Sequence, residues 1–326
     1  MGRRIIFLGF PGVQALDIVG PHQMFVGADE AMAGAYTVLI AAPKAGPVAA
    51  SSGLNLGADL DLADLNARFW RPTDTCVAVG GEDVAMRRAL AAGAIASAIR
   101  AAAGVGARLA SVCSGAFFLA QVGALDGKRA ATHWRAAADL ARLHPAITVD
   151  ADALYVEDGG VWTSAGVTAG IDLALAMIEA DCGRAVALSV ARRHVVFRKR
   201  PGGQSQFAEP DAGAALADPR LAKLARAIAA APAADWSTSA MAAAAGMSLR
   251  SLTRAFARES EESPARFVER LRVERARVAL LESARSIAEI AAECGFGAAR
   301  GLERAFARHL GVAPIGFRER FGARRS

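Results

Sequence analysis

The sequence predicts an α/β domain built on a parallel sheet, followed by an all-α domain that contains two helix-turn-helix units. Two observations carry this prediction. Over about the first 185 residues, short apolar runs alternate with helical patterns, which is typical of a layered α/β sheet. In the last third of the chain one unit occurs twice, because residues 252–270 and 302–320 are identical at 10 of 19 positions. Such a repeat indicates one structural unit used twice.

The expected parallel strands are short, rich in branched residues and closed by turn residues, as buried strands are. They cover Ile5–Phe10, Thr37–Ala41, Thr75–Val79 and Leu109–Val112. Helices are expected at Asp17–Ala33, Asp83–Gly104, Ser114–Val122 and Thr168–Cys182. Tyr155–Asp158 and Val161–Thr163 flank Gly159-Gly160 and predict a hairpin.

The chain of 326 residues predicts two domains or, alternatively, three small ones. Residues 183–200 are expected to continue as a basic helix, which Pro201-Gly-Gly203 ends. The proposed boundaries are 1–200 for the first domain, 201–217 for a linker rich in Pro, Gly, Gln and Ser, and 218–326 for the second. Asp218-Pro219 is the expected start of the first helix after the linker.

Each copy of the repeat is predicted to form a helix, a glycine-containing turn and a second helix. In copy one, Ser237 caps the first helix, Gly246-Met247 forms the turn, and the second helix covers 248–259. In copy two, Ser286 is the cap, Gly295-Phe296 the turn, and 298–309 the second helix. One long helix over 264–282 joins the copies and would hold them about one DNA turn, roughly 34 Å, apart.

The second helix of each copy has an apolar face and an arginine-bearing face. Leu249, Leu252 and Phe256 are expected to face inward in copy one, as are Leu302 and Phe306 in copy two. The residues expected on the opposite faces are Arg250, Thr253 and Arg254, and Arg300, Gly301, Glu303 and Arg304. Arginine there can bond guanine or a phosphate. Alternatively, Arg254 and Arg304 form salt bridges as scaffold residues, since both copies share them.

The net charge of +6 is unevenly placed. Residues 1–200 hold 19 basic and 18 acidic side chains, whereas residues 201–326 hold 19 basic and 14 acidic ones. A basic surplus in the repeat region indicates binding to nucleic acid, although arginines that only solvate helix faces would give the same count.

The four cysteines show neither disulfide-type nor metal-type spacing, which favours the reducing cytoplasm and predicts no metal site and no cofactor. No run of about 18 apolar residues is present, so no membrane span is expected.

Cys113 follows the strand at 109–112 and begins an apolar helix, which predicts a sharp strand-to-helix turn that presents the thiol. The helix start there is expected to lower the thiol pKa and to offer N–H groups to an anion. Asp17, after the first strand, and His133 are the expected acid and base partners. The simpler alternatives are an inert packing cysteine and, because Trp134 is adjacent, a histidine packed near the core.

Residues 236–318 resemble the DNA-binding domain of the AraC/XylS family of transcription regulators. The matching residues are Ala245-Gly-Met-Ser248, Arg250-Ser-Leu-Thr-Arg254, Ser263-Pro264, Arg272, Ile287-Ala-Glu-Ile-Ala291, Gly295-Phe296, Phe306 and Pro314 with Phe317-Arg318. The resemblance implies that the exposed positions of both second helices contact bases of double-stranded promoter DNA, and it implies RNA polymerase as a partner. These positions are Arg250, Thr253, Arg254, Ala299, Arg300, Gly301, Glu303 and Arg304. Copy two departs from the family pattern at Ala298, Ala299 and Gly301, so copy one is expected to be the stronger base reader.

Residues 1–185 resemble the PfpI-like, glutamine-amidotransferase-like superfamily. The matching pieces are Leu16-Asp-Ile-Val-Gly-Pro21, Gly80-Gly81, Val112-Cys-Ser-Gly115, Ala131-Thr-His-Trp134, Thr163-Ser-Ala-Gly166 and Ala169-Gly-Ile-Asp172. This resemblance implies a flavodoxin-like sheet and a ligand pocket at Asp17, Gly81, Cys113, Ser114 and His133. Ser114 replaces the histidine that follows the nucleophile of the peptidases.

The two resemblances together are typical of the GlxA-like regulators. They imply a homodimeric regulator that senses a small effector, for example an amine or an amino-acid derivative, and that is not an enzyme. The alternative is a cysteine-dependent hydrolase or hydratase, similar to isonitrile hydratase, in which Asp17, Cys113 and Ser114 would be catalytic.

Overall fold

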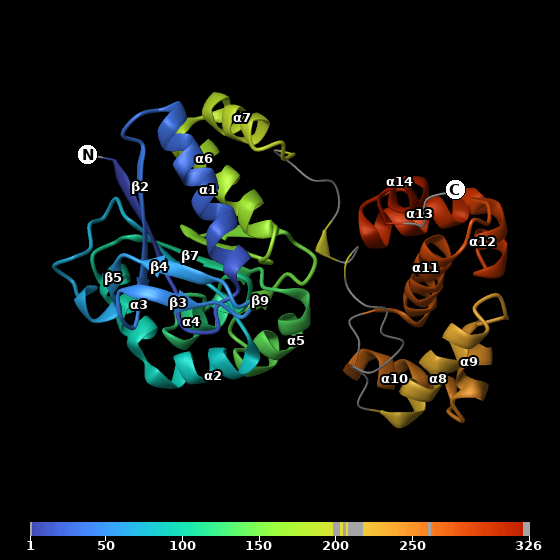
Figure 1. Ribbon diagram of the computed structural model, residues 1–326. Helices are drawn as coiled ribbons and strands as arrows, with labels where there is room; N and C mark the ends of the chain where they lie inside the picture. Colours follow the sequence, from blue (N-terminus) through green and yellow to red (C-terminus); the bar gives the residue numbers. More distant parts are fainter. Residues whose placement is uncertain (1, 198–202, 205–206, 208–217, 260–261, 322–326) are drawn as a thin grey trace. The chain divides into compact units, whose positions relative to one another are not determined.

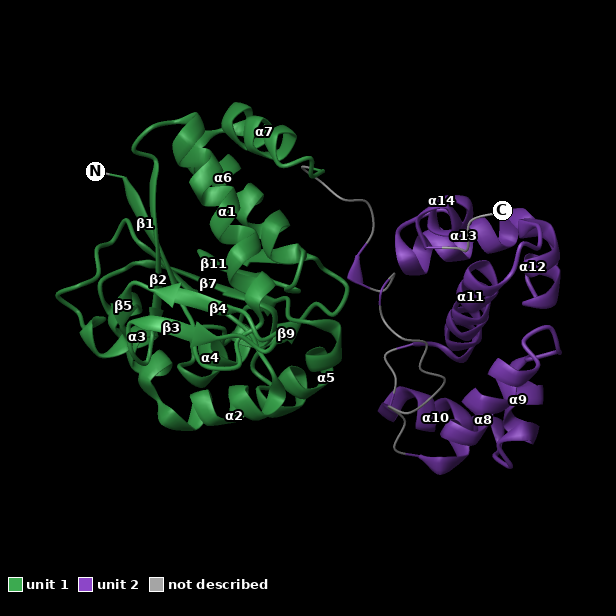
Figure 2. Ribbon diagram, in the orientation of Figure 1, with its two compact units in different colours: residues 1–200 green, residues 201–326 purple. Residues whose placement is uncertain are grey.

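The computed structural model describes residues 2–197, 203–204, 207, 218–259 and 262–321. The chain forms two compact units, Met1–Arg200 and Pro201–Ser326 (Figure 2). Most of the linker expected at 201–217 lies outside the described residues.

Unit 1 is built on a seven-stranded sheet with the order β10-β11-β7-β6-β1-β2-β5. Its strands are β1 (Arg3–Leu8), β2 (Tyr36–Ala42), β5 (Leu60–Asp61), β6 (Thr75–Ala78), β7 (Arg108–Val112), β10 (Tyr155–Asp158) and β11 (Val161–Ser164). All neighbours are parallel except β10 and β11, which form the expected antiparallel hairpin. In the central strand β1, residues 5–8 are fully buried, as apolar residues of a sheet covered on both faces must be.

Helices cover both faces of this sheet (Figure 1). On one face lie α1 (Ala15–Ala31), α6 (Ala169–Cys182) and α7 (Arg184–Arg193), and on the other α2 (Asp83–Ala92), α3 (Ala94–Gly104) and α4 (Ala116–Gln121). A further helix, α5 (Trp134–Leu143), packs beside the short strand β9 (Thr148–Val149). The expected flavodoxin-like α/β class is confirmed.

Two helix predictions were wrong in extent. The single helix expected over 83–104 is broken at Gly93, which adopts φ +74° and separates α2 from α3. The basic helix expected through residue 200 ends at Arg193, and Val195 follows with φ +55°. Residues 198–200 lie outside the described residues.

The sequence pattern did not predict several short strands of unit 1. A hairpin of β3 (Gly46–Ala49) and β4 (Asn55–Ala58) follows β2, and β8 (Arg129–Ala130) pairs with β9. Each has four residues or fewer, which is too short to show a period.

All regular secondary structure described in unit 2 is helical. Its helices are α8 (Pro219–Ala230), α9 (Thr238–Ala244), α10 (Leu249–Glu259), α11 (Pro264–Glu282), α12 (Ile287–Glu293), α13 (Ala299–Leu310) and α14 (Pro314–Phe321). The helix-turn-helix pairs α9–α10 and α12–α13 turn at Gly246 and Gly295, both with positive φ. Asp218, Ser237 and Ser286 cap their helices as expected.

The repeat is visible in the packing. Each helix-turn-helix has its own apolar core, and α11, about 28 Å long, contributes Leu271 to the first and Val273 to the second. Phe256 packs edge-on against Phe267 at 5.1 Å between ring centroids, and their counterparts 50 residues later pack in the same way at 5.4 Å. The shared leucines and phenylalanines therefore build two equivalent scaffolds.

Within the described residues, every helix is too short or too polar to cross a bilayer.

Candidate functional site

The end of β7 places Cys113 at a strained turn. Cys113 adopts φ +59°, a conformation that non-glycine residues rarely adopt, and a short 3-10 turn leads from it into α4. Two glycines make room for the turn. A Cβ at Gly166 would lie 2.2 Å from the Cβ of Cys113, and one at Gly80 would lie 2.6 Å from Ser114 Oγ. The geometry is that of an elbow that presents a side chain above the sheet edge.

Asp17, in the first turn of α1, is fully buried beside this elbow. Its Oδ1 accepts a 2.7 Å hydrogen bond from the N–H of Val167, a residue that also has positive φ (+51°). Its Oδ2 is buried without a hydrogen-bond partner. Burial raises the pKa of Asp17 to about 6, and the Val167 amide, the Cys113 thiol and the Gly80 amide partly oppose that rise.

The expectation of a low thiol pKa at Cys113 was wrong. Burial, and next the negative charge of Asp17, raise the pKa of Cys113, and the hydrogen bond from the Ser114 backbone only partly opposes them. The helix that follows does not compensate, since α4 spans only Ala116–Gln121 and begins three residues beyond the thiol. The raised pKa disfavours the thiolate, which is the nucleophilic form of the side chain.

The remaining predicted residues of this pocket lie at different depths. Ser114 Oγ accepts a long hydrogen bond, 3.4 Å, from the N–H of Gly81. His133 is half-buried and caps α5, where its Nδ1 accepts from the N–H of Arg135. Burial and the charge of Arg135 lower the pKa of His133, so its imidazole is neutral at pH 7.

Thr132 was missed by the sequence reasoning. Its hydroxyl donates a 2.9 Å hydrogen bond to the carbonyl of Cys113 and so fixes the backbone of the strained turn. The stretch Ala131-Thr-His-Trp134 contains this hydroxyl group, but the prediction used only the titratable His133 of that stretch. The structure thus brings Asp17, Cys113 and Ser114 together in one site, with Thr132 supporting it.

The second candidate surface is formed by α10 and α13. Arg250, Arg254, Arg300 and Arg304 are all exposed, and within the described residues none of them makes an ion pair. Among the residues that the structure describes, Arg254 and Arg304 therefore do not form the salt bridges expected of scaffold residues. Arg258 and Arg308, by contrast, pair with Glu259 and Glu269.

Leu249 does not face inward as expected, because its side chain is 54% exposed. Met247, in the preceding turn, packs against the core instead and leaves Leu249 at the exposed start of α10. Beside it, the Thr253 hydroxyl donates a 3.0 Å hydrogen bond to the Leu249 carbonyl. The start of α10 therefore presents apolar surface together with arginine.

In copy two, Glu303 is exposed, whereas Ala299 and Gly301 are half-buried. A Cβ at Gly301 would lie 2.8 Å from the carbonyl oxygen of Phe296, so close packing against the turn requires glycine there. Ala298, which precedes α13, provides no side-chain cap. Among the described residues, no group of three or more His, Cys, Asp or Glu side chains is placed to hold a metal.

Comparison with known proteins finds matches to both units of the chain. The DJ-1/PfpI family model matches residues 3–180, and a helix-turn-helix domain model matches residues 241–320. The transcriptional regulator GlxA of Rhizobium meliloti is 30% identical over 88% of this chain and 86% of its own. An isonitrile hydratase of Pseudomonas putida is 33% identical over 55% of this chain and 72% of its own.

Among solved structures, a ThiJ/PfpI family protein from Pseudomonas syringae is 25% identical, with a TM-score of 0.53 over 76% of this chain and 92% of that one. The two domain matches divide the chain as its two compact units do. The chain therefore belongs to the DJ-1/PfpI family, and with its AraC-type helix-turn-helix domain it is a DNA-binding transcription regulator that carries a ligand-sensing N-terminal domain.

Proposed function

We propose that α10 and α13 enter successive major grooves of promoter DNA and read it with unlike sets of residues. The observation that carries this proposal is the group of four exposed arginines without ion pairs on these two helices. These guanidinium groups do not have to break an ion pair before they bond guanine or phosphate. Their hydrogen bonds to DNA therefore add directly to the binding free energy. Thr253 and Glu303 supply further base contacts, and at Ala299 and Gly301 the backbone comes close to the DNA.

The copies differ in how they would read bases. Copy one offers Arg250 and Arg254 together with the methyl group of Thr253 and the exposed Leu249. Copy two offers Arg300 and Arg304 with the acceptor Glu303, which suits a cytosine amino group. We therefore assign copy one to a thymine- and guanine-containing sub-site and copy two to a different one.

The experiment starts with duplexes selected from a random library by the full-length protein. Fluorescence anisotropy then compares the wild type with the double variant Arg254→Ala and Arg304→Ala. Arg226→Ala is the matched control, because Arg226 is an exposed arginine of α8 that forms no ion pair with the described residues and lies outside α10 and α13. The double variant should bind at least tenfold more weakly and the control unchanged. Wild-type affinity in the double variant would show that these arginines do not contact DNA.

For unit 1, we propose that the Asp17–Cys113 pocket binds a small amine or amino-acid derivative as effector. The buried Oδ2 of Asp17, which lacks a hydrogen-bond partner, supports this choice, because a ligand ammonium would satisfy it. The half-buried, uncharged groups of Ser114 and His133 offer further hydrogen bonds, as does the N–H of Gly81. In a thermal-shift screen, some amines should raise the melting temperature of the wild type but not that of Asp17→Asn.

The wider assembly also belongs to this proposal. We expect a homodimer in the cytoplasm that recruits or blocks RNA polymerase, with the effector changing the balance between DNA-engaged and disengaged arrangements. The effector can shift that balance only by its differential affinity for the two arrangements.

A catalytic role is the second candidate, and the likeness to an isonitrile hydratase favours it. Asp17, Cys113 and Ser114 lie together, yet the raised pKa of Cys113 argues against an activated thiolate. Purified protein should therefore leave isonitriles unchanged. Turnover that Cys113→Ala abolishes would make unit 1 an enzyme.

A further inference from the structure

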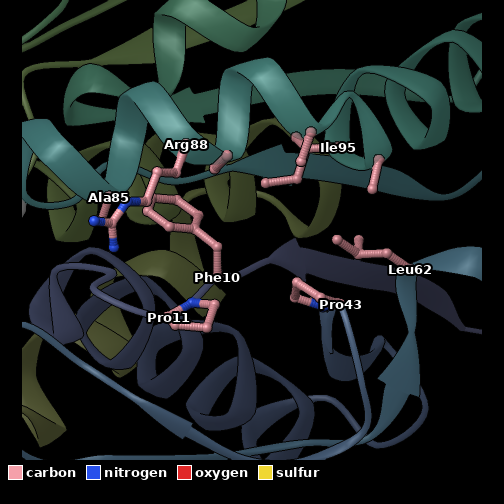
Figure 3. A pocket seen from close by; sticks show the side chains of 10 residues that line it. Phe10, Pro11, Pro43, Leu62, Ala85, Arg88 and Ile95 are labelled. Atoms are coloured by element: carbon pink, nitrogen blue, oxygen red, sulfur yellow. The ribbon is translucent and has the colours of Figure 1, made fainter.

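A second pocket of unit 1 lies apart from the Asp17–Cys113 site. It has a volume of about 250 Å³ and lies between α2, α3 and the segments that follow β1 and β2 (Figure 3). Its walls are apolar and include Phe10, Pro11, Pro43, Leu62 and Ile95. None of the residues of the Asp17–Cys113 site lines it.

The position of this pocket in the sheet is one at which ligands bind. Strand β1 lies between β2 and β6, and the chain leaves β1 toward α1 on one face but leaves β6 toward α2 on the other. Such a reversal leaves a crevice outside the carboxyl ends of the strands. Pro11 follows β1, Pro43 follows β2, and Ala85 comes from α2, so all three segments meet at the pocket.

The pocket walls are held by close packing. Phe10 packs edge-on against Phe118 at 5.8 Å between ring centroids. Gly12 adopts φ +90°, and a Cβ there would lie 2.5 Å from the Cβ of Ala85, so α2 is seated directly on the loop after β1. Because its walls are fixed in this way, the pocket is formed before any ligand arrives.

Arg88 is the only charged residue that lines the pocket. It projects from α2 beside the ring of Phe10 (Figure 3). It is exposed, and within the described residues it makes no ion pair and no side-chain hydrogen bond. The pocket therefore combines an apolar chamber with one unpaired guanidinium group.

We propose that this pocket binds a small carboxylate with a compact aromatic or branched apolar body, as a ligand separate from the effector at Asp17. A cavity of about 150 Å³ with apolar walls holds one benzene ring, so the larger volume here accommodates a ring and its carboxylate. A planar guanidinium can hold both carboxylate oxygens at once. A phosphate would have a further oxygen to satisfy, and no other charged side chain lines the pocket to bond it.

Calorimetric titration of the full chain with benzoate, phenylacetate and hexanoate tests the proposal, with benzamide as the uncharged match for benzoate. Arg88→Gln should weaken carboxylate binding at least tenfold and leave benzamide binding unchanged. Arg87→Gln, at the neighbouring exposed position of α2, is the matched control and should bind as the wild type does. Ala89→Phe, which fills the chamber, should remove both kinds of ligand.

Cys113→Ala separates the two sites of unit 1, because it should leave benzoate binding intact. Three results would overturn the proposal. They are no binding of any of the three acids at millimolar concentration, carboxylate binding that Arg88→Gln does not weaken, and carboxylate binding that Cys113→Ala abolishes. Since Arg88 is exposed, circular dichroism of Arg88→Gln should match the wild type and so exclude a loss of fold.

Discussion

Asp17 and Cys113 each depart from the ordinary chemistry of their side chains, and burial is the common cause. The carboxyl group of Asp17 loses solvation, and the hydrogen bonds from Val167, Cys113 and Gly80 only partly offset that loss, so its charged form is destabilised. The loss of solvation and the neighbouring carboxylate also raise the pKa of the Cys113 thiol. A pair of this kind stores unfavourable free energy that a bound ammonium group would release.

Asp17→Asn should raise stability in a pH-dependent way. The folded pKa of Asp17, about 6, exceeds the unfolded value near 4, so the native state holds the proton more tightly. Wild-type stability is therefore lost as the pH rises from about 4 through about 6 and is constant above that window. Asparagine keeps an oxygen for the Val167 amide and carries no charge. The variant should gain up to about 3 kcal/mol relative to the wild type at pH 7 and nothing near pH 4.

Urea denaturation at several pH values measures this difference. Asp64→Asn, at an exposed aspartate, is the control and should show no such trend. A gain for Asp17→Asn that is the same at every pH would mean that the carboxyl group is not strained by burial.

Leu249 gives a second test at the scale of one residue. Its exposed side chain at the start of α10, with the Thr253 methyl beside it, suits the methyl group of thymine in the major groove. Leu249→Ala should weaken binding to a selected duplex by about 1 kcal/mol, a few-fold, through the loss of apolar contact. Replacing thymine by uracil in that sub-site should weaken the wild type by a similar factor and the variant much less. If the replacement of thymine by uracil lowers the DNA affinity of both proteins equally, Leu249 does not contact the thymine methyl group.

At the scale of single elements, the helices that read DNA differ in how they start. In α10 the N–H of Ser251 donates to Ser248 Oγ at 3.1 Å, whereas α13 follows Ala298, which cannot cap. Without a side-chain cap, the first turn of α13 can offer a backbone N–H group to a phosphate, which fits a copy that relies on backbone contacts.

Because α10 has a side-chain cap and α13 has none, exchanging serine and alanine at these two positions should change the free energy of unfolding in opposite directions. Ser248→Ala should lower the free energy of unfolding of unit 2 by about 1 kcal/mol, and Ala298→Ser should raise it by about 0.5 to 1 kcal/mol. Equilibrium denaturation of the full chain followed by circular dichroism measures both. Ala298→Ser should also weaken DNA binding if a phosphate occupies the start of α13. A stabilised variant with unchanged DNA affinity would show that no phosphate binds there.

The sequence was most informative where local signals and periodicity agree. The helix expected over 264–282 has those bounds in the structure, because Ser263-Pro264 starts it and its apolar residues face two cores. The break at Gly93 was missed because the surrounding alanines continue a helical pattern on both sides. The elbow at Cys113 was recognised from its strand, but its pKa depends on burial among segments distant in the chain, which a local pattern does not contain.

For the whole molecule, two units with separate cores divide sensing from DNA binding. Unit 1 gathers a buried carboxylate, a thiol and a second pocket at one edge of its sheet. Unit 2 repeats one scaffold along α11 and varies the exposed residues. Because scaffold residues recur and reading residues differ, the two copies are expected to bind unlike sub-sites of one operator.

The most direct test pairs variants of each copy with duplexes in which one sub-site is scrambled. One variant combines Arg250→Ala with Arg254→Ala, and the other combines Arg300→Ala with Arg304→Ala. Each variant should be insensitive to scrambling its own sub-site and remain sensitive to scrambling the other, with the larger loss of affinity for copy one. If both variants lose affinity equally on every duplex, including one with both sub-sites scrambled, the arginines contribute only unspecific charge and the account of two unlike readers is wrong.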